Sequence, residues 1–421
     1  MKIFLLLFFA LFLNATTLDE LIDLAIKQNK NIQSANIDTQ IKDAQKSSVK
    51  RSNYGKFEIV SSYTKYNTAR TLIPLSPIAI QTNQATTTTK DILSVGINYS
   101  SVLFSGFAKT SDIEIASLAQ NISKIKQHLT KEEIIFNIKS IYTQILSLKE
   151  QEKAQVDYTQ ALNNLKSIIE QEIQYGKKAR IDLIKVEVEV QNSKTKDEIL
   201  KTNILNLKSI LSYLVGSQVN DLAPLNIIVE KESFIQDIQD LDKIKILESN
   251  LIKLKKQIQK ANSINYPIVL LNAYYGQNSG EDEVTGDYGD EEVWRAGINI
   301  KYNLFDFGSS SKKISSLKLE YQKAQLAKND AIDSLKKDLQ KAINELNLAI
   351  IEYQNNQTQL QLANESADIE EARYKSNSST LNDLLLAKAK AKLALAKLID
   401  SKYKYQKSKY YIEYLLEKGI K

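Results

Sequence analysis

The chain has 421 residues, and its 12 glycines and 4 prolines leave few points at which regular secondary structure is interrupted. Its net charge of +6 is small beside 56 basic and 50 acidic residues, which indicates a solvated surface of mixed sign rather than a nucleic-acid-binding protein. The absence of cysteine excludes disulfides, thiolate metal sites and cysteine nucleophiles. With one histidine, His128, and no P-loop, the sequence predicts neither an enzyme nor a bound cofactor.

Residues 1–15 have the features of a secretory signal peptide. A short basic start precedes an apolar stretch at 3–13, and Ala15 offers a small residue for cleavage. The apolar stretch is too short to span a bilayer, and no later run reaches the roughly 18 residues of a transmembrane helix. We therefore predict that the mature protein is exported and that any membrane passage uses strands.

The mature chain is predicted to be a duplication. Residues 99–107 return at 300–308 with an offset of 201. The same offset relates Gly96 to Gly297, Asp182 to Asp383 and Tyr213 to Tyr414. The predicted boundaries are a first repeat at 16–216, a linker at 217–240 and a second repeat at 241–418. Each repeat is expected to contain a helix, a strand pair and a long helical hairpin, and the first helix is expected from Leu18 to about Ser48.

Each repeat contains a predicted strand pair, at 56–67 and 92–105 in the first repeat and at 266–276 and 293–305 in the second. In the second copy Ala296, Ile298 and Ile300 alternate with polar or charged residues. A period of two with one apolar face is typical of a strand between lipid and water. A soluble sheet with one wet face gives the same pattern. Aromatic residues towards strand ends, such as Tyr63 and Trp294, favour the membrane.

The loops inside the strand pairs are predicted to be long, polar and exposed. The loop at 276–292 is rich in glycine and acidic residues, a composition that suits Ca²⁺. Its spacing does not fit an EF-hand, so we expect a solvated loop and no metal site.

After each strand pair the apolar period becomes helical. Ile134, Ile138, Ile141 and Ile145 are spaced 4, 3 and 4 residues apart, which is coiled-coil spacing. We predict helical hairpins at 107–215 and 308–418, whose first helices are roughly 100 Å long. Helices of this length need partners along their whole extent, and four strands are too few to close a barrel. The sequence therefore predicts an oligomer in which several chains share one barrel.

The order of these elements resembles the TolC family of outer-membrane efflux proteins over residues 17–418. Its local marks are Leu103-Phe104-Ser105-Gly106 and Leu304-Phe305-Asp306-Phe307-Gly308 at the strand-to-helix junctions, and the hairpin turns in which Gly176 precedes Asp182-Leu183 and Asn377 precedes Asp383-Leu384-Leu385. The resemblance implies a mostly α fold with a β-barrel part and four strands per chain. It further implies a homotrimer with a twelve-stranded barrel and a twelve-helix periplasmic tunnel.

The family resemblance also implies a function. The chain would be a passive exit duct in the outer membrane, in contact with lipid and extending into the periplasm, that docks with a periplasmic adaptor and an inner-membrane pump. Drugs, metal ions and polypeptides all remain open as cargo. The alternative is a periplasmic coiled-coil adaptor or structural protein, which would need one hairpin beside a glycine-rich β domain, whereas this chain has two hairpins.

Two aspartates are implied to act at the periplasmic mouth. Asp383 matches an aspartate ring at the tunnel constriction, but Leu386 stands where the second aspartate of that ring would be. Asp182 matches a position that hydrogen-bonds a tyrosine across the helices, and Tyr374 stands at the position of that tyrosine. Either aspartate has a simpler alternative role, as an acid that complements a helix N-terminus.

The remaining part of this lock differs from the family pattern. In the family an arginine also takes part in this contact between an aspartate and a tyrosine. Ser379 stands at the position of that arginine, so Arg180 or Lys178 is expected to take its place. The prediction is that Asp182→Ala or Tyr374→Phe raises conductance. The second hairpin, around 374–386, is predicted to be the mobile one.

Overall fold

The computed structural model describes residues 15–82, 86–232, 234 and 238–419. The predicted signal peptide therefore lies outside the described residues except for Ala15, and the predicted linker is described only in part. The chain forms two compact units, one within residues 1–37, 125–245 and 329–421 and one within 38–124 and 246–328. Each unit contains parts of both repeats.

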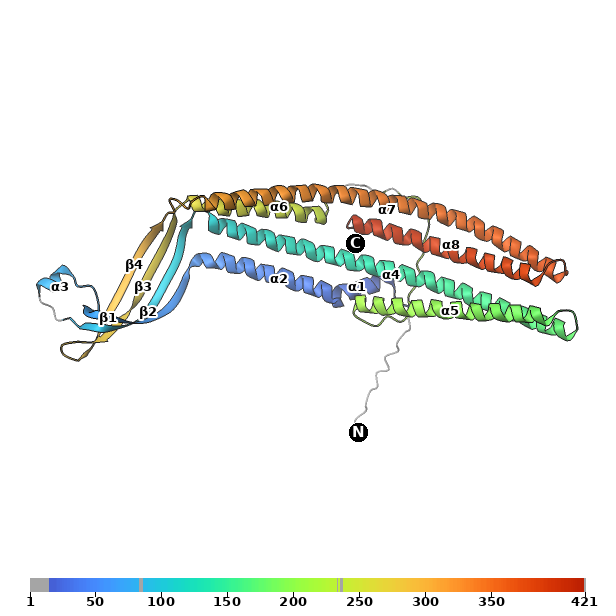
Figure 1. The fold of residues 1–421 in the computed structure, drawn as a ribbon, viewed down its shortest axis with the longest axis horizontal. Coiled ribbons are helices and arrows are strands. Elements are labelled where there is room, and N and C mark those ends of the chain that lie inside the picture. Colours follow the sequence, from blue (N-terminus) through green and yellow to red (C-terminus); the bar gives the residue numbers. More distant parts are fainter. Residues whose placement is uncertain (1–14, 83–85, 233, 235–237, 420–421) are drawn as a thin grey trace, which may run out of the picture. The chain divides into compact units, whose positions relative to one another are not determined.

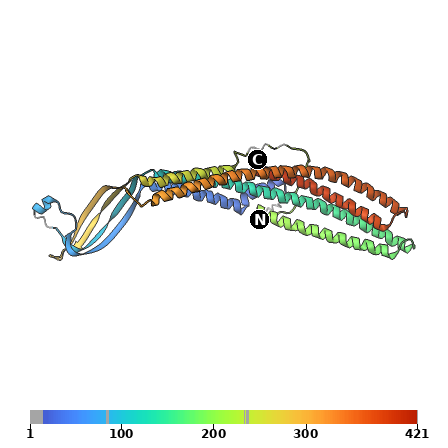
Figure 2. The same ribbon diagram turned by 45° about the horizontal axis from the view of Figure 1, so that its top comes forward.

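The second unit contains one antiparallel sheet in the order β1-β2-β3-β4 (Figures 1 and 2). The strands are β1 (Lys56–Thr71), β2 (Thr88–Ser105), β3 (Ile268–Glu281) and β4 (Tyr288–Lys301). The pairing of β2 with β3 joins the two repeats, so the four strands form one sheet and not two separate hairpins. Within the described residues, β1 and β4 each have a strand neighbour on one side only.

The strands extend further into the polar segments than the sequence predicted. Most of the expected loop at 276–292 is strand, because β3 continues to Glu281 and pairs there with Tyr288. Backbone hydrogen bonds between strands do not require apolar side chains, so polar sequence can continue a ladder. At its other end β4 stops at Lys301 rather than at 305, because Lys301 pairs with Ile268, the first residue of β3.

The short loop that remains is organised by Asp282. Its carboxylate accepts hydrogen bonds from the backbone N–H of Thr88 at 2.7 Å, of Val284 at 2.9 Å and of Thr285 at 3.0 Å. These bonds fix the turn that joins β3 to β4 and tie it to the start of β2. Among the described residues, no group of three or more histidines and acidic side chains is arranged to hold a metal ion.

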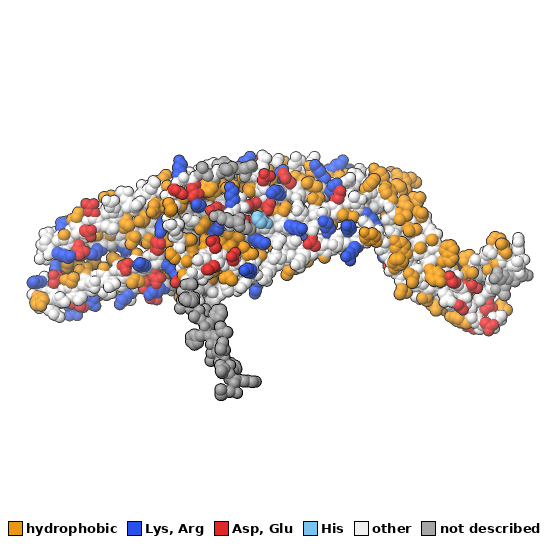
Figure 3. All heavy atoms as spheres, turned by 180° about the vertical axis from the view of Figure 1, so that it is seen from behind, with side chains coloured by type: hydrophobic (Ala, Val, Ile, Leu, Met, Phe, Trp, Pro, Cys, Tyr) orange, Lys and Arg blue, Asp and Glu red, His pale blue; other side chains and the backbone are white. Residues whose placement is uncertain are grey.

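One face of the sheet is apolar across all four strands. The pairing places Ile59, Ile97, Tyr275 and Trp294 in one row. Ile59 is 83% exposed and Trp294 is 74% exposed, so this row faces outward from the unit. Figure 3 shows hydrophobic side chains gathered over the sheet, with acidic side chains towards its loop end. The opposite face carries polar residues such as Asn98, because successive side chains alternate.

Helices make up the rest of the fold. They are α1 (Leu18–Gln28), α2 (Lys30–Arg51), α3 (Pro77–Gln81), α4 (Ala108–Gln174), α5 (Arg180–Val215), α6 (Asp242–Ala261), α7 (Ser309–Lys375) and α8 (Leu381–Leu415), with short 3-10 turns at Ser52–Tyr54 and Asn262–Asn265. α4 and α7 have 67 residues each, and the offset of 201 relates both of their ends. No helix among the described residues is both long enough and apolar enough to cross a membrane.

The expected single helix from Leu18 to about Ser48 is instead two helices that meet at Asn29. The Asn29 backbone is extended, and its side-chain oxygen accepts hydrogen bonds from the N–H groups of Asn31 and Ile32. The side-chain amide donates to the Leu214 carbonyl at 2.7 Å. Asn29 therefore caps α2 and fixes the α1–α2 corner to the end of α5.

The coiled-coil residues form the core of the first unit. Ile134, Ile138 and Ile145 of α4 are almost fully buried, as the heptad spacing predicted. Tyr142 lies among them and donates its hydroxyl to the Ala223 carbonyl at 2.6 Å. This bond holds the segment that follows α5 against α4. A second cluster, around Leu339 of α7, packs against α8.

Contacts between helices give their order in the first unit. α4 pairs with α5 through Lys166 and Glu187 at 2.8 Å and with α8 through Glu150 and Lys402 at 3.4 Å. α8 pairs in turn with α7, where ion pairs join Lys404 to Glu352 and Lys388 to Glu371. The helices therefore lie in the order α5, α4, α8, α7 (Figures 1 and 2).

Candidate functional site

The two hairpin ends meet around Tyr374, near the end of α7. Tyr374 is 6% exposed. It packs in an apolar cluster with Leu162, Leu165, Ile169, Val186, Val190, Leu381 and Leu384. Burial, with the negative charges of Glu172 and Asp182 nearby, raises the pKa of Tyr374 to about 12. The hydroxyl is therefore neutral at physiological pH.

The predicted hydrogen bond between Asp182 and Tyr374 is not formed. The Tyr374 hydroxyl is buried without a hydrogen-bond partner among the described atoms. The Asp182 carboxylate lies instead 3.9 Å from the Lys185 ammonium, in the first turn of α5. The ring of Tyr374 packs against apolar residues of both hairpins. The contact between the two hairpin ends therefore depends on the ring and not on the hydroxyl.

Lys178 connects the first hairpin turn to the second. Its ammonium lies 4.3 Å from the centroid of the Tyr374 ring and 3.4 Å from the side-chain oxygen of Asn377. A lysine over a tyrosine face is a cation–π contact, worth roughly 0.5–2 kcal/mol depending on exposure. Arg180, the other predicted substitute, is exposed and makes no ion pair or hydrogen bond with any residue that the structure describes.

The turns themselves have equivalent backbones. Gly176 and Asn377, which the offset relates, both adopt left-handed conformations, with φ of 69° and 58°. Glycine reaches this region without strain, and asparagine reaches it more easily than other residues. The residue change between the two turns therefore leaves the turn geometry the same, and the difference between the hairpins lies in their side chains.

Asp383 caps α8. Its carboxylate accepts hydrogen bonds from the Thr380 backbone N–H at 3.3 Å and from the Thr380 hydroxyl at 2.6 Å, and its own N–H donates to the Thr380 hydroxyl oxygen at 3.2 Å. These contacts form a capping box at the helix N-terminus. The hydrogen bond from Thr380 holds the pKa of Asp383 below its usual range. Within one chain Asp383 therefore has the helix-terminal role that was the alternative to an aspartate ring.

The sequence analysis missed Arg373, which braces the second turn. Its guanidinium contacts Glu370 at 2.6 Å and the Ser378 carbonyl at 3.3 Å. Ser379, where the family arginine is missing, donates its hydroxyl to Glu370 at 2.6 Å. The signal in the sequence was the spacing of three residues between Glu370 and Arg373 in the last turn of the helix.

The strand-to-helix junctions in the second unit share an unusual backbone. Gly106 and Phe107 are both left-handed, with φ of 58° and 67°, and so are Phe307 and Gly308, with φ of 57° and 84°. The offset of 201 pairs Gly106 with Phe307 and Phe107 with Gly308. Each junction thus has two consecutive left-handed residues and one glycine, but the glycine takes the first place in one repeat and the second place in the other.

The aromatic residues of the two junctions have different surroundings. Phe107 packs edge-on against both Phe104 and Tyr266, with ring centroids 5.6 Å and 6.0 Å apart. Phe305 and Phe307 pack on each other at 4.8 Å and are otherwise exposed. The first junction is therefore closed by the 3-10 turn before β3, and the second presents its aromatic pair outward.

Alanine at Gly106 is expected to destabilise the protein more than alanine at Gly308. A Cβ on Gly106 would lie 2.6 Å from the Ser263 carbonyl oxygen and 2.7 Å from the Tyr266 Cβ, whereas a Cβ on Gly308 would meet nothing within 4 Å. In both variants the left-handed conformation of alanine lowers the free energy of unfolding by about 1–2 kcal/mol, and only Gly106→Ala adds a steric clash. The thermal midpoints of the two purified variants measure the difference, and equal midpoints would contradict the proposed packing of Gly106.

A polar cluster lies further along the hairpins, between α4, α5 and α8. Gln155 of α4 is 2% exposed and donates to the Ser193 carbonyl at 3.0 Å. Lys392 of α8 donates to the Gln155 side-chain oxygen and lies 4.8 Å from the ring centroid of Tyr158. Burial and the positive charge of Lys196 lower the pKa of Lys392 to about 8, against an opposing effect of Glu189.

Lys392 is expected to make stability depend on alkaline pH. Its pKa is about 8 in the folded protein and about 10.5 when unfolded, so between these values the unfolded chain binds more protons. The free energy of unfolding should therefore rise with pH from about 8 to 10.5. Replacing Lys392 with methionine should remove this rise. Thermal unfolding followed by circular dichroism across the window measures it, with Lys390→Met as an exposed control.

The second half of the chain resembles a known protein family in sequence, and nearly the whole chain resembles solved structures in fold. Residues 244–416 match the family described as outer membrane efflux protein. This part of the chain is similar to outer membrane efflux proteins. The match agrees with the family resemblance drawn from the sequence. No curated protein matches the sequence significantly.

Solved structures match almost the whole chain. A membrane protein from Pseudomonas aeruginosa has a TM-score of 0.79 at 16% identity, over 95% of this chain and 93% of that chain. The CmeC outer membrane channel of Campylobacter jejuni has 0.79 at 17%, over 96% and 86%. The open MtrE outer membrane channel of Neisseria gonorrhoeae has 0.74 at 17%, over 96% and 89%. At these identities the comparisons establish the fold, and the predicted fold class is confirmed for the single chain.

Proposed function

We propose that the chain is the outer-membrane channel of a tripartite efflux or type I secretion system, a passive exit duct for cargo. The observation that carries the proposal is the sheet, whose outward face is apolar across four strands while its opposite face is polar. A strand array of this kind suits a boundary between lipid and an aqueous lumen. The match of residues 244–416 to the outer membrane efflux protein family supports the same conclusion.

The assembly in this proposal is a homotrimer. Four strands cannot close a barrel, and unpaired edges such as those of β1 and β4 are not tolerated in lipid. Three copies would pair β4 of one with β1 of the next and give a barrel of twelve strands. The helical hairpins of the three copies would then line a common tunnel through the periplasm, whose inner mouth would dock with an adaptor and an inner-membrane pump.

The gate in this proposal lies at the hairpin ends. Asp182, Arg180, Tyr374 and Asp383 are all within the two turns or the helix ends beside them. The second hairpin would be the moving one, held to the first by Lys178 through Tyr374 and Asn377. Arg373, which stays within the second hairpin, would move with it.

Reconstitution tests the proposal. The protein, purified from outer membranes in detergent, should have the mass of a trimer by light scattering and should produce uniform conductance steps in planar lipid bilayers. Its mobility on gels should change on heating, as for a barrel that resists detergent. A protein recovered as soluble monomer from the periplasm, without conductance, would contradict the proposal and favour the adaptor alternative.

A further inference from the structure

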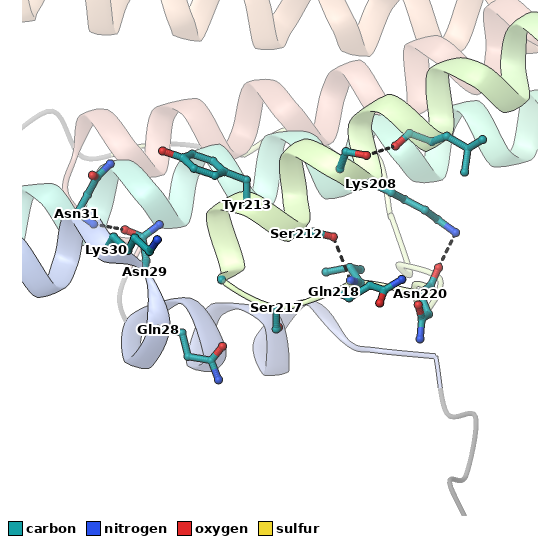
Figure 4. A pocket seen from close by; sticks show the side chains of 14 residues that line it. Gln28, Asn29, Lys30, Asn31, Lys208, Ser212, Tyr213, Ser217, Gln218 and Asn220 are labelled. Carbon is teal, nitrogen blue, oxygen red and sulfur yellow. Dashed lines mark hydrogen bonds between the residues drawn. The ribbon is translucent and has the colours of Figure 1, made fainter.

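Two pockets away from the hairpin ends are bordered by a positively charged side chain. The larger, about 850 Å³, lies between the α1–α2 corner and the end of α5. Lys208 donates there to the Asn220 carbonyl, so its charge holds the segment after α5 (Figure 4). The smaller, about 490 Å³, lies against the polar face of the sheet. Arg295 of β4 borders it and makes no ion pair or hydrogen bond with any residue that the structure describes, so its charge is available to a solute.

Arg295 lies over a tyrosine ring. Its guanidinium carbon is 5.0 Å from the centroid of the Tyr274 ring. The two residues are direct partners across β3 and β4, in the row of the sheet that contains Asn98 on the polar face. A guanidinium stacked on a ring keeps its N–H groups in its own plane. They therefore remain free to donate to a carboxylate or a phosphate, with two hydrogen bonds at once.

A pair of glycines leaves room for this tyrosine against the sheet. Gly96 and Gly276 are paired across β2 and β3, in the row next to that of Tyr274. A Cβ on Gly276 would lie 2.5 Å from the Tyr274 hydroxyl oxygen, and a Cβ on Gly96 would lie 2.7 Å from the same atom. The phenol end of the ring therefore fills the space that side chains would take in this row. The ring lies along the sheet and gives Arg295 a fixed surface.

The segment that follows β1 borders the same pocket. Leu72 is buried, and its carbonyl accepts a hydrogen bond from the Asn278 amide at 2.6 Å. Asn278 is fixed in turn by Ser94, whose hydroxyl donates to its side-chain oxygen at 2.6 Å. Pro74 of this segment and Arg295 both line the pocket. The segment therefore narrows the space in front of the polar face at the level of Arg295.

We propose that Arg295, held on Tyr274, is an anion-selecting site in the lumen of the channel, with carboxylate or phosphate groups as its ligands. The proposal rests on the channel of the proposed function and adds the sign of the charge that its sheet favours. Other charges of the polar face do not cancel that of Arg295. Lys56 and Glu58 pair with each other at 2.7 Å. Glu291 is four residues away along β4, about 13 Å, which exceeds the screening length of about 8 Å at physiological salt.

Reversal potentials in planar bilayers under a KCl gradient test the sign of the selectivity. Arg295→Gln should lower the permeability ratio of chloride to potassium several-fold. Lys301→Gln is the matched control, because it removes the same charge from the same face of the same strand. Lys301 makes no cation–π contact with any ring that the structure describes, so this variant should change the ratio much less.

Inorganic phosphate tests the geometry of the site. Added to the unchanged protein, it should reduce the chloride current, because the guanidinium can hold it by two hydrogen bonds. Arg295→Lys keeps the charge and loses the planar fork of donors. This variant should keep the reversal potential of the unchanged protein in KCl, and it should need several-fold more phosphate for the same reduction in current.

The amount of heat-modifiable protein in the outer-membrane fraction shows that each variant has inserted before it is recorded. Equal shifts in Arg295→Gln and Lys301→Gln, or no shift in either, would overturn the site and leave the proposed channel in place. Equal phosphate sensitivity in Arg295→Lys and the unchanged protein would overturn the role of the guanidinium. Absence of conductance from the unchanged protein would overturn the channel and the site together.

Discussion

A lysine in place of Ile298 is expected to remove most of the folded protein from the outer membrane. Ile298 is 62% exposed on the apolar face of β4, opposite Leu271 of β3. A lysine on the lipid face of a membrane barrel costs about 2–4 kcal/mol near the middle of the bilayer. In the proposed trimer each assembly contains three such lysines, so the effect on insertion should exceed that of a single site.

Asn299→Lys is the matched control, because the next residue along the strand points to the opposite, polar face. This variant should insert and conduct like the unchanged protein, apart from a shift in ion selectivity. The amount of heat-modifiable protein in the outer-membrane fraction measures both variants. Equal loss in the two variants would contradict the assignment of the apolar face to lipid.

Tyr374→Ala is expected to raise the conductance of the reconstituted channel several-fold. The substitution removes a buried ring from the cluster that joins the hairpin ends and removes the surface on which Lys178 rests. Loss of a large buried aromatic side chain costs about 3–5 kcal/mol, so the two hairpins should separate more often at this point. Single-channel recording in planar bilayers gives the conductance and the fraction of time spent in each level.

Tyr374→Phe separates the ring from the hydroxyl. The hydroxyl is buried without a partner among the described atoms, so its removal should leave conductance unchanged and slightly favour the folded state. The hydrogen-bonded lock inferred from the family predicted an increase instead. An increase with phenylalanine would show that the hydroxyl finds a partner in the assembly, and the ring would then not be the main contact.

Long-range regularity was the part of the fold that the sequence predicted well. The offset of 201, found from a few matched residues, recurs in both ends of α4 and α7. The heptad residues of α4 are buried as predicted, because a period of 3.5 can be satisfied only by another helix. The strand ends were less predictable, since backbone pairing continues into polar residues such as Glu281 for as long as a partner strand is present.

The break at Asn29 and the contacts of the hairpin ends were not predictable in the same way. Asn29 ends a helix because its amide finds the Leu214 carbonyl, a partner 185 residues away. The hairpin ends were assigned from a family pattern that names Asp182 and Tyr374 as a bonded pair. In the structure both residues lie at the hairpin ends, but the side chain that contacts Tyr374 across the hairpins is Lys178. Its long side chain reaches the face of the Tyr374 ring from the turn of the first hairpin.

The equal length of α4 and α7 limits how this protein can change in size. Both hairpins must reach the same depth for their turns to meet, so a deletion in one alone would leave its end short by about 1.5 Å for every residue removed. A deletion that is not a multiple of seven would also turn the apolar stripe away from its neighbour. Viable length variants should therefore remove or add whole heptads in α4, α5, α7 and α8 together. Relatives with longer or shorter hairpins should differ in such fourfold steps.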